Sequence, residues 1–247
     1  MSVLRLPPTG ASRVSGAMAG ARRGRPPSRN EILCNGRLGG VEPEVLAAEF
    51  GTPLYAYDLD VVDRQVAALR AILPPVFELA YAVKANPALA IVDHLARLGV
   101  GADVASGGEL ELARRAGMAP ASTVFTGPGK RDAELDAAVS AGIRAVTVES
   151  VRELGRLEAR AAAAGHVVPI LLRTAVPQAV GLERVRLVGD DGAGKFGMDD
   201  DDIERAARAA VRSPHLDLLG FHGFGASNVL DAEVLGDHIE RTVDQAV

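Results

Sequence analysis

Lysine is scarce in this sequence, and one of its few lysines stands where a strand is expected to end. The 247 residues contain three lysines and 24 arginines. A guanidinium stays protonated and cannot form an imine, whereas a desolvated lysine amine can lose its proton and attack a carbonyl. Lys84 follows the apolar run 79–83, which predicts a buried strand. Lys84 is therefore a candidate Schiff-base lysine, unless GC-rich coding explains the arginine excess and Lys84 is an ordinary strand-end residue.

Further polar residues are expected where strands end and helices begin. They are Asp103, Ser106, Glu109, Glu149, Ser150, Arg173, His222 and Ser227. If the strands form a barrel, all these ends lie on one face, which is where barrel enzymes build their active sites. Each residue also has a structural interpretation: Ser106 and Ser150 are good helix caps, and Glu109 suits a first helical turn. We favour the cap for Ser150, and for Asp103 and Glu109 both interpretations stay open.

Short apolar segments alternate with alanine-rich amphipathic segments from residue 79 onward. Strands are expected over 79–85, 101–106, 123–128, 144–150, 168–173 and 216–225. Helices are expected at about 87–98, 107–116, 131–141, 151–164 and 199–212, and from Leu230 onward. Asn86 and Pro87 would cap and open the first of these helices. The alternation predicts parallel strands with crossover helices, and strands that are apolar throughout predict a sheet covered on both faces.

Two α/β architectures are compatible with this alternation, a doubly wound sheet and a (β/α)8 TIM-type barrel. No glycine-rich dinucleotide fingerprint follows the first strand, and the even strand spacing of about 22 residues favours the barrel. Only six βα units are visible where a barrel needs eight, so residues 59–247 are expected to form an incomplete barrel. The segment 31–58 would enter it, with a helix at 43–50 and a strand at 52–58, and a helix at 60–72 follows.

Composition argues against several kinds of partner and site. The net charge of −5 disfavours general nucleic-acid binding, and Cys34 is the only cysteine, so no disulfide framework or cysteine-based zinc site is expected. No apolar run approaches membrane-spanning length. Residues 1–30 hold six arginines and no acid, and we interpret them as a disordered leader. A cytoplasmic protein without nucleic-acid or membrane partners is expected.

A long glycine-rich segment, 176–198, is expected to be a functional loop. Part of it nearly matches a phosphate-binding loop, but Phe196 stands where the magnesium-binding hydroxyl would be. We therefore expect no nucleotide site there. The acidic run 199–202 is expected to complement the dipole of the helix that it opens rather than to bind a metal.

Six segments of the chain resemble, in order and at fitting intervals, the motifs of one enzyme family. They are 50–58, 81–86 around Lys84, 103–110, 149–154, 172–173 and 195–197. Together they are similar to the alanine-racemase-type, or fold-type III, pyridoxal-phosphate decarboxylases, and most of all to the diaminopimelate decarboxylase group of lysine biosynthesis. Six motifs in register are far more specific than any one of them.

The resemblance implies a cofactor, a reaction and a set of site residues. Pyridoxal 5'-phosphate would form an imine with Lys84, and an amino-acid substrate would lose its α-carboxylate as CO2. Asp103 and Glu109 would act with Lys84 in catalysis. The residues implied in cofactor binding are Lys84, Ser106, Arg173, His222, Phe224 and Ser227. The family also implies a homodimer, and a C-terminal β-domain that is expected to be absent from residues 1–247.

The sequence departs from the family at the end of the sixth strand. A His-x-Gly-Ser-Gln motif is usual there, and this chain has Phe-Gly-Ala-Ser-Asn over 224–228. Ser227 keeps the serine position, while Phe224 replaces the histidine that stacks on the cofactor ring. Phenylalanine can stack but cannot donate a proton, and His222, on the same strand face, is a candidate substitute. A related decarboxylase with a substrate other than diaminopimelate fits this pattern equally well.

Two other interpretations stay open. A fold-type III racemase uses the same cofactor with a different outcome, although the motifs after the second strand favour the decarboxylase. The other is a non-catalytic fragment, because the family's glycine-rich phosphate loop and its Glu-Pro-Gly-Arg motif are expected beyond residue 247. Residues 1–247 by themselves are therefore expected to be inactive.

Overall fold

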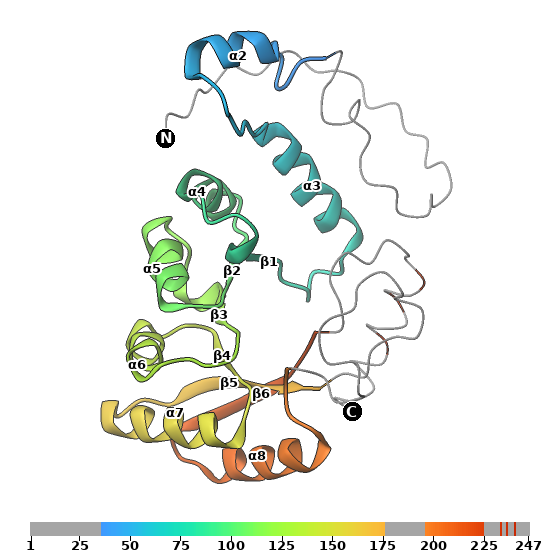
Figure 1. Ribbon diagram of the computed structural model, residues 1–247. Helices are drawn as coiled ribbons and strands as arrows, with labels where there is room; N and C mark the ends of the chain where they lie inside the picture. Colours follow the sequence, from blue (N-terminus) through green and yellow to red (C-terminus); the bar gives the residue numbers. More distant parts are fainter. Residues whose placement is uncertain (1–35, 176–195, 225–232, 234–235, 237–239, 241–247) are drawn as a thin grey trace. The chain divides into compact units, whose positions relative to one another are not determined.

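The computed structural model describes residues 36–175 and 196–224, together with Glu233, Gly236 and Glu240 (Figure 1). The chain divides into two compact units, Met1–Phe77 and Glu78–Val247, which are described separately. The leader expected over 1–30 and most of the last expected helix lie outside the described residues.

The first unit contributes two helices. α2 spans Pro43–Phe50 and α3 spans Leu59–Ile72, as expected. The strand expected at 52–58 is wrong, because no described strand pairs with this segment. It ends instead at Asp58, whose carboxylate caps α3 by accepting the Asp60 N–H at 3.0 Å. A strand-like pattern produces a strand only where a partner strand can satisfy its backbone groups.

The second unit is built on a parallel sheet of six strands. The strands are β1 Ala80–Ala82, β2 Gly101–Val104, β3 Thr123–Phe125, β4 Ala145–Val148, β5 Val168–Thr174 and β6 Leu216–Gly223. They lie side by side in sequence order, without the reversal that defines a doubly wound sheet. The α/β class and the sheet of an incomplete (β/α)8 barrel are therefore confirmed.

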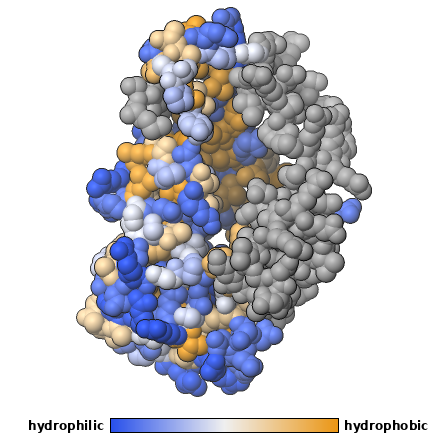
Figure 2. Space-filling model, viewed as in Figure 1, coloured by the Kyte–Doolittle hydropathy of each residue, from blue (hydrophilic) through white to orange (hydrophobic). Residues whose placement is uncertain are grey.

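Five helices connect these strands and lie on one side of the sheet (Figure 1). They are α4 Leu89–Arg97, α5 Gly107–Arg115, α6 Asp132–Ala141, α7 Val151–Ala164 and α8 Asp200–Arg212. α8 opens on Asp199, whose carboxylate accepts the Asp202 N–H at 2.8 Å, so the acidic run begins the helix as expected. Hydrophilic residues predominate on the outward surfaces of α7 and α8, at the bottom of Figure 2. The helices thus turn their apolar sides to the sheet.

The strand register assigns the sheet residues to two faces. Paired residues of parallel strands project to the same face, and side chains alternate along each strand. The apolar face beneath the helices consists of Ala102, Val104, Phe125, Val146, Val148, Ile170 and Leu172, all 0 % exposed. The opposite face carries Asp103, Thr126, Thr147, Glu149, Arg173 and His222 at or just beyond the strands' carboxyl ends. One sheet therefore combines a buried core and a polar face.

One irregularity in β6 decides which of its side chains reach the polar face. The register with β5 shifts between Ile170 and Leu171, so Leu219 is the extra residue of a β-bulge. An extra residue reverses the alternation of side chains beyond it. His222 therefore pairs with Arg173 and projects to the polar face, whereas an unbroken strand would direct it toward the helices.

Gly220, next to the bulged residue, has a φ of 151°, a conformation that L side chains rarely adopt. Apart from its two chain neighbours, no described residue places a heavy atom within 4 Å of a Cβ added there, so the strain of Gly220→Ala is confined to the backbone. We expect this change to lower the free energy of unfolding by about 1–3 kcal/mol in urea denaturation. The matched control is Gly155→Ala within α7, where a Cβ also meets open space and the expected effect is a gain of roughly 0.5–1 kcal/mol. Equal effects of the two changes would contradict the backbone argument.

Candidate active site

Polar side chains from five neighbouring strands meet at the carboxyl ends of the sheet. We call Asp103, Thr126, Glu149, Arg173 and His222 the strand-end cluster. Their positions follow from the register, because each lies on the face opposite the helices. In parallel α/β barrels this end of the sheet is where active sites are built.

Lys84 lies beside this cluster but not at the end of a strand, as had been expected. β1 ends at Ala82, and Lys84 belongs to the 3-10 turn Val83–Ala85. The expected helix start is also wrong, because Asn86 accepts the Ala88 N–H at 3.0 Å and α4 begins only at Leu89. The side-chain bond of the asparagine stabilises a local turn before the helix. The turn leaves Lys84 exposed, with its Nζ 5.7 Å from the centroid of the Phe224 ring.

Asp103 is held by a residue that the sequence analysis did not single out. The Thr126 hydroxyl donates a hydrogen bond of 2.6 Å to Asp103 Oδ1, which joins the end of β2 to the residue after β3. Thr126 is 7 % exposed, so its hydroxyl needs a protein partner. The sequence signal that could have identified Thr126 is a hydroxyl residue at the end of an apolar run.

Arg173 and Glu149 form a buried ion pair at the centre of the cluster. Arg173 NH1 donates to Glu149 Oε1 at 2.7 Å, and the two side chains are 9 % and 5 % exposed. The guanidinium carbon also lies 5.0 Å from the ring centroid of Phe196 and 5.7 Å from that of Phe224. Cation–π contacts of this kind hold a guanidinium plane in one orientation. Phe196, which stands where a phosphate-binding loop would have its hydroxyl residue, is thus a neighbour of the site.

His222 stands next to Arg173 and is neutral. Burial, and then the positive charge of Arg173, lower the pKa of His222 to about 4. Its Nδ1 is buried without a hydrogen-bond partner among the described residues, and the same holds for Thr147 Oγ1 and Glu149 Oε2. Buried polar atoms are rarely left unpaired. Three such atoms on one face indicate a place that a ligand or water completes.

Ser106 and Glu109 form a capping arrangement at the start of α5. The Ser106 hydroxyl accepts the Glu109 N–H at 3.2 Å, and Glu109 Oε2 accepts the Ala105 N–H at 2.8 Å. Ser150 and Glu153 repeat this arrangement at the start of α7, so the cap favoured for Ser150 is confirmed. The cofactor role of Ser106 and the catalytic roles of Asp103 and Glu109 stay predictions.

The two described lysines differ in what surrounds their amines. Lys130 is 3 % exposed, and its Nζ donates to Gly127 O, Thr147 O and Glu153 Oε1 at 2.8, 2.6 and 2.8 Å. An ammonium has three donors, so all of those of Lys130 are in use. Lys84, by contrast, is exposed, and its amine lies over the Phe224 ring. Lys195 and Ser227 lie outside the described residues.

The chain matches a known domain over most of its length. Residues 59–246 match the family model described as pyridoxal-dependent decarboxylase, pyridoxal binding domain. This chain belongs to the pyridoxal-dependent decarboxylases. It is 36% identical over 200 residues to diaminopimelate decarboxylase of Neisseria meningitidis serogroup B. The matched residues cover 79% of this chain and 47% of that protein. It is 31% identical over 208 residues to L-glutamyl-[BtrI acyl-carrier protein] decarboxylase of Niallia circulans, covering 84% and 48%.

Solved structures agree with the fold. Diaminopimelate decarboxylase of Helicobacter pylori complexed with L-lysine superimposes with a TM-score of 0.73 at 28% identity, covering 82% of this chain and 52% of that one. The Aquifex aeolicus protein AQ1208 gives a TM-score of 0.73 at 33% identity, covering 84% and 48%. The chain therefore spans about half the length of the relatives that it matches.

The described residues of this chain fit the pyridoxal cofactor of its family. Lys84 offers a primary amine, and Phe224 offers a ring for stacking beside it. The unpaired buried atoms of Thr147, Glu149 and His222 leave hydrogen bonds for a polar ligand. The described part of the chain holds no group of three or more potential metal ligands. Among its helices, none combines the length and the apolarity needed to cross a bilayer.

Proposed function

We propose that the protein carrying this chain is a pyridoxal-phosphate-dependent amino-acid decarboxylase that releases CO2 from the α-carbon of its substrate. The observation that carries the proposal is the primary amine of Lys84 beside the Phe224 ring, at the carboxyl ends of a parallel sheet in a chain of this family. The sequence similarity to two kinds of amino-acid decarboxylase supports it.

The chain's own residues suggest a division of roles. Lys84 would hold the cofactor through its primary amine, and the same amine would be placed to carry a proton near the α-carbon of the substrate. When bound, the cofactor would supply the electron sink that decarboxylation needs. Asp103, held by Thr126, would orient Lys84 and the cofactor ring. Glu109, at the start of α5, holds the backbone of Ala105, which connects β2 to that helix.

The remaining residues hold the ring and its substituents. Phe224 would stack on the cofactor ring. Arg173 lies beside Phe224, and its positive charge, together with burial, disfavours protonation of His222. Neutral His222 offers Nδ1 as a hydrogen-bond partner. Ser106 and Ser227 are proposed to bind the cofactor, Ser227 in the phosphate-holding position that the resemblance implies.

The substrate is proposed to be an amino acid that is a small molecule. The full-length enzyme is proposed to be a cytoplasmic homodimer with no nucleic-acid or membrane partner. The relatives named above act on diaminopimelate and on an L-glutamyl group carried by a protein, by their names. The net charge of −5 supports the absence of a nucleic-acid partner.

The direct test is CO2 release from carboxyl-labelled amino acids by the full-length protein loaded with cofactor, with meso-diaminopimelate and L-glutamate among them. Optical rotation of the recovered substrate is followed in the same reactions. We expect CO2 release that Lys84→Ala slows by roughly 10²–10⁴-fold. Racemisation without CO2 release would favour a racemase over the decarboxylase. If neither reaction is detected, both functions are refuted.

We expect Phe224→Ala to weaken cofactor binding, because the ring loses a stacking partner. An aromatic pair contributes roughly 0.5–1.5 kcal/mol beyond its buried area, which corresponds to roughly a 2- to 12-fold rise in the dissociation constant. The measurement is cofactor dissociation followed by absorbance, with Phe224→Tyr as the control that keeps a ring. Unchanged binding in the alanine variant would count against stacking.

Residues 1–247 expressed alone are proposed to bind the cofactor weakly and to be inactive. The support is that the chain spans about half of its relatives, and that β1 and β6 each pair with only one described strand. Unpaired strand edges favour association with other chains. CO2 release above background from a monodisperse preparation of these residues would contradict this.

A further inference from the structure

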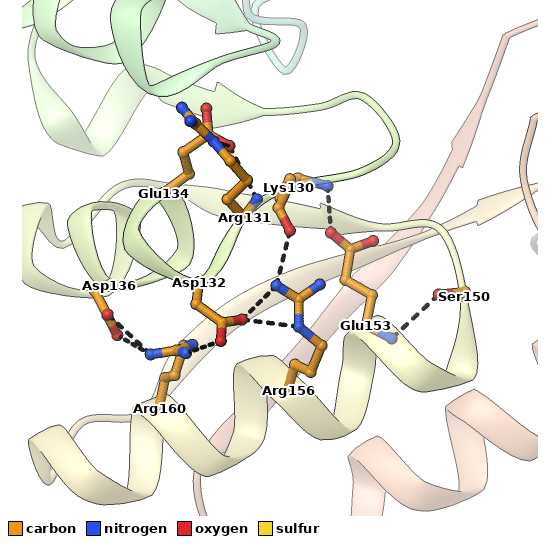
Figure 3. Close-up of polar contacts among 9 residues, drawn as sticks. All are labelled: Lys130, Arg131, Asp132, Glu134, Asp136, Ser150, Glu153, Arg156 and Arg160. Carbon is orange, nitrogen blue, oxygen red and sulfur yellow. Dashed lines mark hydrogen bonds and ion pairs between the residues drawn. The ribbon is translucent and has the colours of Figure 1, made fainter.

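Lys130 is a buried charge for which the proposed reaction has no use. It follows the β3 strand, and its ammonium lies between the ends of β3 and β4 and the helix α7 (Figure 3). Its three acceptors come from three different segments: Gly127 after β3, Thr147 within β4 and Glu153 in the first turn of α7. Burying an ammonium is costly unless every donor is paired, and here every donor is.

The residue type at position 130 is itself informative. Arginine outnumbers lysine by 24 to three in this chain. Three acceptors around one point suit a compact ammonium, whereas a guanidinium is planar and directs its donors in a fixed fork. The geometry therefore explains why lysine is retained at this enclosed position.

Glu153 carries the arrangement from Lys130 to the active site. One carboxylate oxygen binds Lys130, and the other accepts the N–H of Glu149 at 2.9 Å. The side chain of Glu149 then accepts the hydrogen bond of 2.7 Å from Arg173. A continuous series of polar contacts thus joins Lys130, on the helix side of the sheet, to Arg173 on the polar face.

The backbone of Lys130 is fixed from the outside as well. Arg156 NH2 donates to the Lys130 carbonyl at 2.9 Å, and the Arg156 guanidinium also pairs with Asp132 (Figure 3). The Ser150 hydroxyl accepts the Glu153 N–H at 3.1 Å and holds the other end of the arrangement. Lys130 and Glu153 therefore meet with little freedom to move.

We propose that Lys130 is a positioning residue of the active site: through Glu153 it fixes the backbone at Glu149, and so aims the Glu149 carboxylate at Arg173. The consequence for cofactor binding rests on the proposed function, whereas the order of the Glu149 backbone does not. Lys130 does not contact the cofactor or the substrate in this role.

The test compares Lys130→Met and Glu153→Gln with Leu157→Ala in the full-length protein. Leu157 is a 0 % exposed core residue of the same helix, so its truncation destabilises without touching the polar contacts. Glu153→Gln is the milder variant, because glutamine keeps the shape of the glutamate side chain. It decides the test if Lys130→Met does not fold. Hydrogen exchange of the Glu149 amide is measured without cofactor, and cofactor dissociation is measured separately.

In both polar variants we expect exchange of the Glu149 N–H to speed up at least about tenfold more than exchange of the N–H groups of β4. The reason is that the Glu153 carboxylate, which accepts the Glu149 N–H, loses its partner Lys130 in one variant and its charge in the other. Cofactor dissociation should become faster in the same variants. In Leu157→Ala, exchange at Glu149 should rise only as much as exchange in the rest of β4, and cofactor dissociation should not change beyond what the loss of stability explains. Lys130→Arg should not restore the protection of Glu149.

Exchange in the two polar variants that matches the Leu157→Ala pattern would overturn the positioning role. Selective loss of Glu149 protection with unchanged cofactor dissociation would overturn the link to the active site. A wild-type protein that binds no pyridoxal phosphate would instead refute the proposed function, and the exchange measurement would still decide the role of Lys130 in ordering Glu149.

Discussion

Borohydride reduction of the cofactor-loaded protein should attach the cofactor to Lys84. Of the two described lysines, Lys130 is enclosed and uses its three donors, while Lys84 is exposed beside the Phe224 ring. An amine must reach the aldehyde to attack it, and the Lys130 amine is 3 % exposed with all three of its donors engaged by protein acceptors. Peptide mapping by mass spectrometry identifies the modified residue.

Lys84→Ala should lose the covalent link and, with it, roughly 10²–10⁴-fold in the rate of the chemical step, the usual contribution of a positioned acid or base. Lys84→Arg is the matched variant that keeps the positive charge, and we expect it to be as inactive as the alanine variant. Label on Lys130 or Lys195 in the wild-type protein would refute the assignment of Lys84.

Arg173→Met should destabilise the protein strongly, because it leaves the Glu149 carboxylate buried without its partner. Breaking a buried ion pair from one side costs about 3–5 kcal/mol, whereas replacing both partners by apolar residues is often close to neutral. We therefore expect most of the loss to be recovered in Arg173→Met/Glu149→Met. Urea denaturation without cofactor measures the free energy of unfolding of each variant.

The control for this prediction is Arg208→Met in α8. Arg208 pairs with Glu204, but the two side chains are 67% and 62% exposed. Exposed pairs contribute little to stability because water and salt screen them, so no measurable change is expected. A double variant of Arg173 and Glu149 that is no more stable than Arg173→Met would show that the cost arises from something other than the unpaired carboxylate.

Local patterns in the sequence were sufficient to predict the six strands and five connecting helices of the second unit, and their order. Apolar runs alternating with amphipathic segments predicted the βα units, and the helix caps at Ser106 and Ser150 follow from hydrogen bonds within four residues. Boundaries were less well predicted: β1 ends at Ala82, and the segment 52–58 is not a strand. Strand ends depend on which partner is available, and local sequence does not specify a partner.

The arginine excess and the six motifs in register determined, without any coordinates, that Lys84 is the lysine to test and that the chain resembles the pyridoxal-phosphate decarboxylases. Only the tertiary structure decided which polar residues meet. The bulge at Leu219 brings His222 beside Arg173, and Lys130 reaches Glu153 across 23 residues of sequence. A one-residue shift in a strand moves every later side chain to the other face, and a buried charge finds its partners only after the strands and helices have packed. Both outcomes depend on long-range contacts, which is why residue types and spacing alone did not determine them.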